Sequence, residues 1–271
     1  MKWLVRLPAL FVLVLVVNGF PWPGRAEEAR WGEPPSQFYR PLSTDLRLGS
    51  ADVLAVAHNA GDGGPSTDLA VARGADVVEI DVSPVDGRLY AAHVPPPDWL
   101  PTIAYHAPTL GEAWNRTAGA RFVLLDLKDT SPAALRSVVA FLHSHQDGRR
   151  VFVSARSIAA LASLNERAPD AVRLLSIATQ RGLTALLDDP SQADSLNGVS
   201  IRADLLDAET MAWFKDRGLL VFAWTVNDVA QLNDLVALGI DAVTTDNLAI
   251  LDAMHWAEQH RAATNLGRLF P

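Results

Sequence analysis

Short hydrophobic runs alternate with longer segments of helical spacing from residue 53 to the end of the chain. The runs are four to six residues long and rich in β-branched residues. Continuously apolar runs of this length are typical of strands that are buried on both faces of a parallel sheet. Strands are therefore expected at residues 53–57, 77–82, 121–126, 151–154, 171–176, 198–201, 220–224 and 242–245.

The segments between these runs predict helices, and several begin with a clear start signal, such as Ser131 followed by Pro132, or Asp207 with Glu209 in the first turn. Eight strand-then-helix units in about 200 residues predict an α/β fold of the (β/α)8 TIM barrel type. A doubly wound open sheet is the alternative, but no glycine-rich phosphate loop follows the first strand. The helices are expected at residues 67–73, 109–117, 131–145, 158–167, 181–187, 207–216, 228–238 and 247–259.

The first 50 residues differ from this pattern. Lys2 and Arg6 precede an apolar run over residues 7–17, and the small residues Gly24 and Ala26 follow it, which predicts a signal peptide over residues 1–26. The run is shorter than the roughly 20 residues that span a bilayer, so an uncleaved membrane anchor is the less favoured alternative. Residues 27–50 are polar and interrupted by proline and predict a linker or arm, which leaves residues 51–271 for the barrel.

Charge and composition limit the partners. The formal net charge is −8, and removal of residues 1–26, which hold three basic residues and no acid, makes it −11. Nucleic acid is not an expected partner of so acidic a chain. The absence of cysteine excludes disulfides and thiolate chemistry. Together with the signal peptide it favours export to a bacterial periplasm or secretion, with membrane contact through the N-terminal segment if that segment is retained.

The ends of the predicted strands are where a barrel places its chemistry. Glu79 and Asp81 are two residues apart on one strand and therefore share a face, and Asp126 ends the next strand. Three carboxylates form an oxygen-rich site that suits one divalent cation, Mg²⁺ or Ca²⁺. Lys128 follows two residues later, where it would neutralise a phosphate oxygen or a developing alkoxide, or only balance the acids in a salt bridge.

His58 and His93 flank the Glu79–Asp81 pair and are both expected at strand ends on the same rim. Two imidazoles so placed favour a pair in which one accepts and the other donates a proton near neutral pH. The other five histidines lie on outer helices or, in the case of His106, in a loop, and they form no zinc motif. Ser154 and Ser176 lack a nucleophile elbow, which argues against a serine hydrolase.

Three further rim residues have weaker expectations. Trp224 is expected to form a stacking wall of the pocket or to pack in the core. Arg202, which ends the sixth strand, is a candidate cation for substrate binding. Asp246 is expected to order the last loop or to cap the final helix, and no chemical role is assigned to it.

The segment GADVVEIDVSPVDGRLYAAH, residues 74–93, resembles the glycerophosphodiester phosphodiesterase family, as do LLDLK, FVSARS, FAWTVN and GIDAVTTD further along the chain. The resemblance covers most of residues 53–252 and implies a metal-dependent TIM barrel that releases glycerol 3-phosphate and an alcohol. It further implies that His58 and His93 are the acid and base, that Glu79, Asp81 and Asp126 bind the metal, and that Lys128 stabilises charge. In that family a neighbouring hydroxyl of the substrate is thought to attack phosphorus through a cyclic intermediate.

The chain departs from the family pattern at the substrate. Asn59 follows the first histidine where the family usually has arginine, so Asn59 takes the substrate-binding position without the guanidinium. The related sphingomyelinase D-like phospholipases, which act on lysophospholipid or sphingolipid head groups, share the barrel and are the first alternative. Their catalytic-loop disulfide is impossible here without cysteine. A catalytically silent barrel that binds phosphodiesters is the second alternative, although such a barrel has no physical need for three clustered carboxylates.

Overall fold

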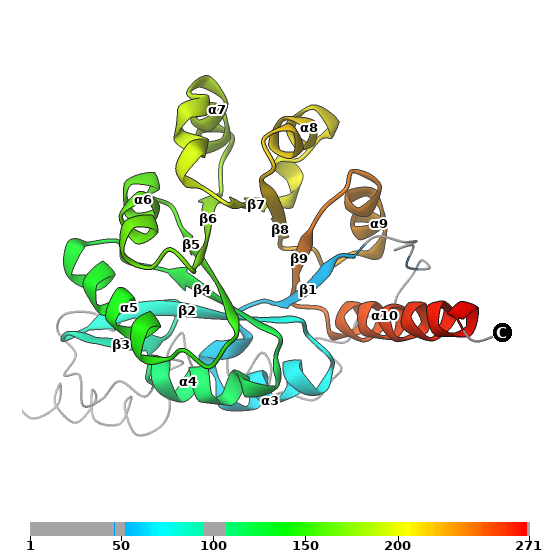
Figure 1. The fold of residues 1–271 in the computed structure, drawn as a ribbon, viewed down its shortest axis with the longest axis horizontal. Coiled ribbons are helices and arrows are strands. Elements are labelled where there is room, and N and C mark those ends of the chain that lie inside the picture. Colours follow the sequence, from blue (N-terminus) through cyan, green and yellow to red (C-terminus); the bar gives the residue numbers. More distant parts are fainter. Residues whose placement is uncertain (1–45, 47–51, 95–106, 270–271) are drawn as a thin grey trace, which may run out of the picture.

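Eight parallel strands close into a barrel in the computed structural model, which describes residue 46 and residues 52–94 and 107–269 (Figure 1). The hydrogen-bonded order is β1-β9-β8-β7-β6-β5-β4-β2, and β2 also pairs with β1, which closes the ring. The predicted TIM barrel is thereby confirmed. The strands are β1 (Leu54–Ala57), β2 (Val77–Val85), β4 (Phe122–Leu127), β5 (Arg150–Ala155), β6 (Val172–Ile177), β7 (Gly198–Arg202), β8 (Leu220–Trp224) and β9 (Ala242–Thr245).

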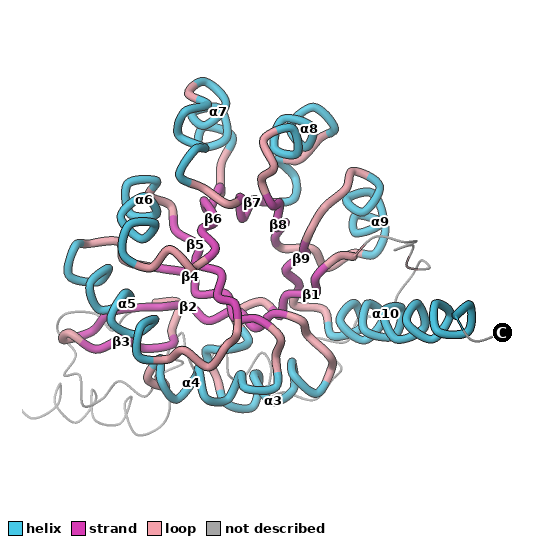
Figure 2. The backbone as a smooth tube through the Cα atoms, in the orientation of Figure 1, coloured by secondary structure: helices cyan, strands magenta, loops and turns pink. Residues whose placement is uncertain are grey.

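The eight predicted helices are also present, and they surround the strands (Figure 2). They are α3 (Gly64–Ala72), α4 (Leu110–Arg116), α5 (Pro132–Ser144), α6 (Ile158–Arg167), α7 (Gln180–Asp188), α8 (Ala208–Asp216), α9 (Val229–Ala237) and α10 (Leu248–Leu269). No helix in the described part of the chain is long and apolar enough to cross a membrane. The predicted signal peptide, the arm except for Leu46, and the loop around His106 lie outside the described residues.

One strand was not predicted. β3 (Arg88–Ala91) pairs antiparallel with the end of β2 and extends it as a hairpin beyond the barrel. Asp86 and Gly87 form the two-residue turn, and both have positive φ, 47° and 76°. An Asp-Gly pair in this conformation is a favoured hairpin turn. The hairpin matters because the chain after β3 returns to the rim of the barrel.

The barrel interior is apolar near the amino ends of the strands, here called the bottom, and polar near their carboxyl ends, the top. A buried cluster fills the lower interior, where Phe152 contacts Phe122 and Phe222 with ring centroids 5.7 and 4.9 Å apart. Since side chains alternate along a strand, the next inward position lies two residues further on. Those positions are polar or aromatic and form the floor of the site. They are His58, Glu79, Asp126, Ser154, Ser176, Ser200, Trp224 and Thr244.

Candidate active site

Three carboxylates predicted to bind a metal lie together at the carboxyl end of the barrel. Glu79 and Asp81 point inward from β2, and the parallel register pairs Asp81 with Asp126 on β4. One oxygen from each residue can be chosen so that all three lie within 4.8 Å of one another. Asp81 is completely buried and Glu79 is 8% exposed, so water screens little of their mutual repulsion.

Glu79 has the least compensated charge of the three. Burial, together with the charges of Asp81 and Asp126, raises the pKa of its carboxyl to about 7 against the opposing charges of His58 and Lys128. Its Oε2 is buried and has no hydrogen-bond partner within the described residues. A buried carboxylate oxygen without a donor costs free energy unless a cation is nearby.

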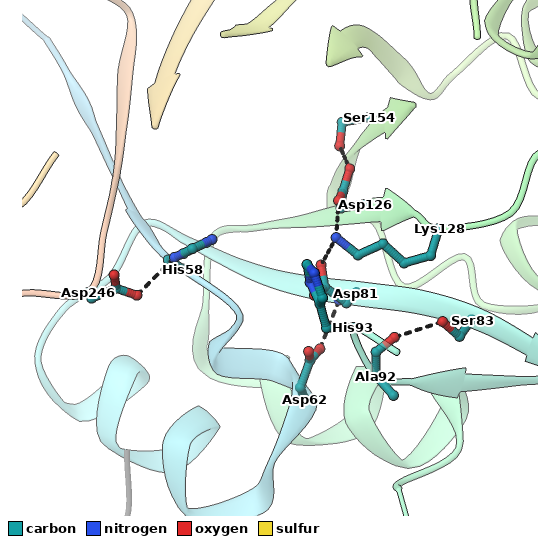
Figure 3. Close-up of polar contacts among 10 residues, drawn as sticks. All are labelled: His58, Asp62, Asp81, Ser83, Ala92, His93, Asp126, Lys128, Ser154 and Asp246. Atoms are coloured by element: carbon teal, nitrogen blue, oxygen red, sulfur yellow. Dashed lines mark hydrogen bonds and ion pairs between the residues drawn. The ribbon is translucent and has the colours of Figure 1, made fainter. Parts of the chain in front are cut away.

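Lys128 joins the other two carboxylates (Figure 3). Its Nζ lies 2.8 Å from Asp81 Oδ1 and forms a second ion pair with Asp126. Burial alone would lower the pKa of Lys128, but the two carboxylates outweigh it and raise that pKa. Lys128 therefore stays protonated and balances the charge of the two acids, and its contact with a phosphate oxygen stays a prediction.

Ser154 was predicted only not to be a nucleophile, and it has a different function in the site. Its hydroxyl, which points inward from β5, donates a hydrogen bond to Asp126 (Figure 3). Asp126 is thus held from both sides, by Lys128 and by Ser154. Two donors fix the orientation of this carboxylate, as outer contacts commonly do for metal ligands.

His58 is oriented by a residue to which the sequence assigned no chemical role. Its Nδ1 lies 2.8 Å from Oδ1 of Asp246, which follows β9. Asn227 holds Asp246 in turn, because its amide donates to Oδ2 at 3.1 Å and its carbonyl accepts from the Asp246 backbone at 2.8 Å. With Nδ1 bound to a carboxylate, the Nε2 atom of His58 remains for proton transfer.

Two opposing effects set the protonation of His58. Burial would lower its pKa, but the hydrogen bond to Asp246 and the charges of Glu79, Asp246 and Asp81 outweigh it and raise the pKa to about 9. The imidazole is therefore protonated at neutral pH when the carboxylates are its only charged neighbours. A divalent cation among those carboxylates would lower this pKa toward neutrality.

His93 reaches the same site through the β3 hairpin and not, as predicted, from the end of a barrel strand. The Ala92 backbone donates to the Asp81 carbonyl at 2.8 Å, and the Ser83 hydroxyl donates to the Ala92 carbonyl at the same distance. These bonds bring His93 Nδ1 within 2.5 Å of Asp81 Oδ2. Burial would raise the pKa of Asp81, but the hydrogen bond from His93 and the charge of Lys128 lower it.

Asp62 is a site residue that the sequence analysis missed. It lies on a short 3-10 helix, η1 (Ala60–Asp62), and its buried Oδ1 accepts from the Asp81 backbone N–H at 2.8 Å. Asn59 precedes η1, is buried, and has a left-handed backbone with φ of 51°. Asparagine tolerates this conformation better than most residues. Backbone geometry therefore favours asparagine at position 59, and its contact with substrate stays a prediction.

Arg202 and Trp224 are neighbours on the opposite side of the barrel. They are paired in register at the ends of β7 and β8. Arg202 is half-exposed and binds Asp204 through Nε and Nη2 at 2.5 and 2.9 Å, and Trp224 is partly buried. Their predicted contacts with substrate stay predictions.

The donor set fits a divalent cation. Glu79, Asp81 and Asp126 supply hard carboxylate oxygens, the ligands that Mg²⁺ and Ca²⁺ prefer. The buried, donor-free Oε2 of Glu79 is the oxygen that most needs such a charge. No cysteine or histidine belongs to the cluster, which argues for a hard metal and against zinc.

Three carboxylates and two histidines, each of which contacts a carboxylate through Nδ1, lie at the carboxyl end of this barrel, an arrangement that suits a hydrolytic site. Residues 123–250 match the sequence profile of the glycerophosphoryl diester phosphodiesterase family. The match confirms the resemblance drawn from the sequence and, with it, the predicted class of enzyme, a phosphoric diester hydrolase. The matched segment begins after Glu79 and Asp81, so the assignment of His58, Glu79, Asp81 and His93 to the site depends on the structure alone.

Solved structures of phosphodiesterases share the fold of this chain. An Oleispira antarctica phosphodiesterase in complex with the product sn-glycerol-3-phosphate is 21% identical, with 74% of this chain and 96% of that chain covered and a TM-score of 0.62. A glycerophosphodiester phosphodiesterase from Parabacteroides distasonis is 18% identical, with 78% and 100% covered and a TM-score of 0.62. One from Thermotoga maritima is 17% identical, with 74% and 97% covered and a TM-score of 0.54. No curated protein matches the chain in sequence.

Proposed function

We propose that this protein is an exported, metal-dependent phosphodiesterase that hydrolyses glycerophosphodiesters to glycerol 3-phosphate and an alcohol. One observation carries the proposal: two histidines, each held at Nδ1 by a carboxylate, flank three carboxylates whose oxygens lie within 4.8 Å of one another. A silent barrel would gain nothing from so much buried negative charge. The sn-glycerol-3-phosphate complex of the Oleispira antarctica phosphodiesterase supports the substrate class.

In the proposed reaction a glycerol hydroxyl of the substrate attacks phosphorus and the bond from phosphorus to the leaving alcohol breaks. One of His58 and His93 accepts the proton of the attacking hydroxyl at Nε2, and the other donates a proton to the leaving oxygen. Water then opens the cyclic phosphate with the two roles exchanged. Glu79, Asp81 and Asp126 would hold Mg²⁺ or Ca²⁺, which when bound would polarise the phosphoryl oxygens. Lys128 would stabilise the remaining negative charge.

The function is tested by hydrolysis of glycerophosphocholine and lysophosphatidylcholine by the full chain with Mg²⁺, with Ca²⁺ or with EDTA. We expect free glycerol 3-phosphate from glycerophosphocholine with a divalent cation and no turnover with EDTA. Choline or a cyclic phosphate from lysophosphatidylcholine alone would instead assign the sphingomyelinase D-like activity. Failure of both substrates with either cation would overturn the proposal in favour of a binding role.

The proposed cation site also makes stability depend on pH. The pKa of Glu79 is raised from 4.5 to about 7, so the folded protein favours the protonated carboxyl. Without cation, the stability that this protonation contributes is complete below pH 4.5 and is lost as the pH rises through 7. The contribution of His58, with a pKa of about 9, is lost at higher pH in the same direction. The cation-free protein should therefore become less stable between pH 5 and pH 9.

Cation binding should reverse this trend, because it requires ionised Glu79. At a cation concentration 100 times the dissociation constant at pH 8, the expected stabilisation is about 2.7 kcal/mol. At pH 5.5 the same concentration should give about 0.9 kcal/mol, since protons compete for one carboxylate. Thermal melts with and without Mg²⁺ or Ca²⁺ measure the difference. A stabilisation that does not change with pH would exclude Glu79 as a ligand.

Export is proposed on the first 26 residues alone, with their basic start, apolar run and small-residue end. The N-terminal sequence of the protein purified from its source would start near residue 27 if the segment is cleaved. A protein that still begins at Met1 and fractionates with membranes would favour the anchor.

A further inference from the structure

The rim above β5 and β6 is basic, although the chain as a whole is acidic. Arg156 follows β5 directly, and Arg181 lies in the first turn of α7, which follows β6. Both side chains are exposed, and within the described residues neither has an ion pair or a hydrogen bond. The two loops and the first turns of α6 and α7 contain no acidic residue. The charge of both arginines is therefore available to a ligand.

Arg202 continues this basic region at the end of β7. Asp204 binds its Nε and Nη2, so Nη1 keeps its donors and the guanidinium is held in one orientation. The segment between β7 and α8 contains acidic residues besides Arg202, since Asp204 lies in it and Asp207 caps α8. Arg202 therefore offers a ligand oriented hydrogen-bond donors, whereas Asp204 and Asp207 offset its charge. We name Arg156, Arg181 and Arg202, with the two serines described next, the basic arc.

Two hydroxyls lie below these arginines. Ser176 and Ser200 are at the inward positions of β6 and β7, and the parallel register pairs them. Within the part of the chain that the structure describes, neither side chain makes a hydrogen bond, whereas Ser154 on the next strand is bound to Asp126. Small residues with available hydroxyls leave room for a polar ligand and supply its hydrogen-bond partners.

The basic arc lies across the barrel from the acidic residues. The strand order places β7 four strands away from β2 in both directions around the ring. Figure 1 accordingly shows α7 across the barrel from α3. The capped N-termini of α6 and α7, at Ser157 and Thr179, face the same rim and add their partial positive charge. A substrate whose phosphate lies at the carboxylates would have one of its two alcohols on this side of the barrel.

We infer that the basic arc binds the leaving alcohol of the substrate, and that this alcohol is a polyol with an anionic group of its own and not a cation such as choline. The inference rests on the proposed phosphodiesterase function and specifies its substrate. Two unpaired arginines and two helix N-termini repel a quaternary ammonium and attract a phosphate. The serine hydroxyls match the hydroxyls of a polyol.

Three glycerophosphodiesters test the inference, since their alcohols differ in charge. Glycerophosphocholine has a cationic alcohol, glycerophosphoglycerol a neutral one, and glycerophosphoinositol 4-phosphate an anionic polyol. We expect kcat/KM of the full chain to increase in this order, by about tenfold per step, and Arg156→Ala and Arg181→Ala to reduce this preference by about tenfold each. Arg136→Ala, which changes an exposed arginine on the outer helix α5, is the matched control and should leave the order unchanged.

Binding to the His58→Ala variant, measured by calorimetry, separates the inference from the function. Affinities in the same order support the basic arc even if no ester is hydrolysed, in which case only the proposed function fails. Turnover with a preference for the choline ester, or a preference that neither arginine variant alters, would overturn the inference and leave the function intact. A preference that falls equally in Arg136→Ala would show a general effect of charge and would also overturn it.

Discussion

Replacing His58 by alanine should lower kcat for glycerophosphodiester hydrolysis by about 10²–10⁴-fold, the range expected when a positioned acid or base is lost. The His58 ring is held by Asp246 at 2.8 Å and lies beside the carboxylate cluster (Figure 3). His93 is the one other described histidine at this site, so no further histidine is placed to take over the proton transfer of His58. KM should change much less than kcat, since the ring acts on a proton in the transition state. Steady-state kinetics with glycerophosphocholine measure both constants.

His143→Ala is the matched control, because His143 is exposed on α5 and, among the described residues, bonds only to the Arg167 carbonyl. It should retain full activity. A His58→Ala protein that keeps more than a tenth of the wild-type kcat would place the proton transfer on another group.

Asp246 is a positioning residue for His58, and its replacement has a distinct signature. The hydrogen bond and the charge of Asp246 both raise the pKa of His58. Asp246→Asn should therefore move the His58 limb of the pH–rate profile to lower pH, besides lowering kcat. A structural role alone would lower activity equally at every pH.

The barrel could be predicted because its strands are buried on both faces and read as short apolar runs. The change from Leu124 to Asp126, or from Phe152 to Ser154, also marks in the sequence where the apolar interior ends. Only β3 was missed. Its sequence, RLYA, contains no β-branched residue, unlike the runs that predicted the barrel strands, although the Asp86–Gly87 turn that introduces it was a usable signal.

The partners of the site residues were harder to predict than the residues themselves. His58 and Asp246 are 188 positions apart and meet only because β1 pairs with β9 when the barrel closes. Asp62 contacts Asp81 through the backbone, which no spacing rule reveals. Strand-end position was the available signal for Asp246 and Asn227, and it cannot distinguish a residue that orients a histidine from one that orders a loop.

Glu79→Gln should have the second large effect, and it should change activity and stability in opposite directions. The variant removes one of three carboxylate oxygens from the cation site, so kcat/KM should fall by about 10³-fold, equivalent to about 4 kcal/mol. Without cation, however, the variant should be more stable than the wild type at pH 8 by about 1–4 kcal/mol, because a neutral amide replaces a buried, donor-free carboxylate.

Thermal melts at pH 8, with and without Mg²⁺ or Ca²⁺, separate the two effects. The wild type should gain stability from the cation, and Glu79→Gln should start higher and gain little. Glu166→Gln, on the exposed face of α6, makes the same chemical change away from the site and should behave as the wild type. A Glu79→Gln protein that is less stable without cation, yet is still stabilised by it, would mean that Glu79 is held by protein donors and that the cation lies elsewhere. The opposite signs in one variant would tie the buried charge to the cation, since the carboxylate that destabilises the empty barrel is the one that binds the metal.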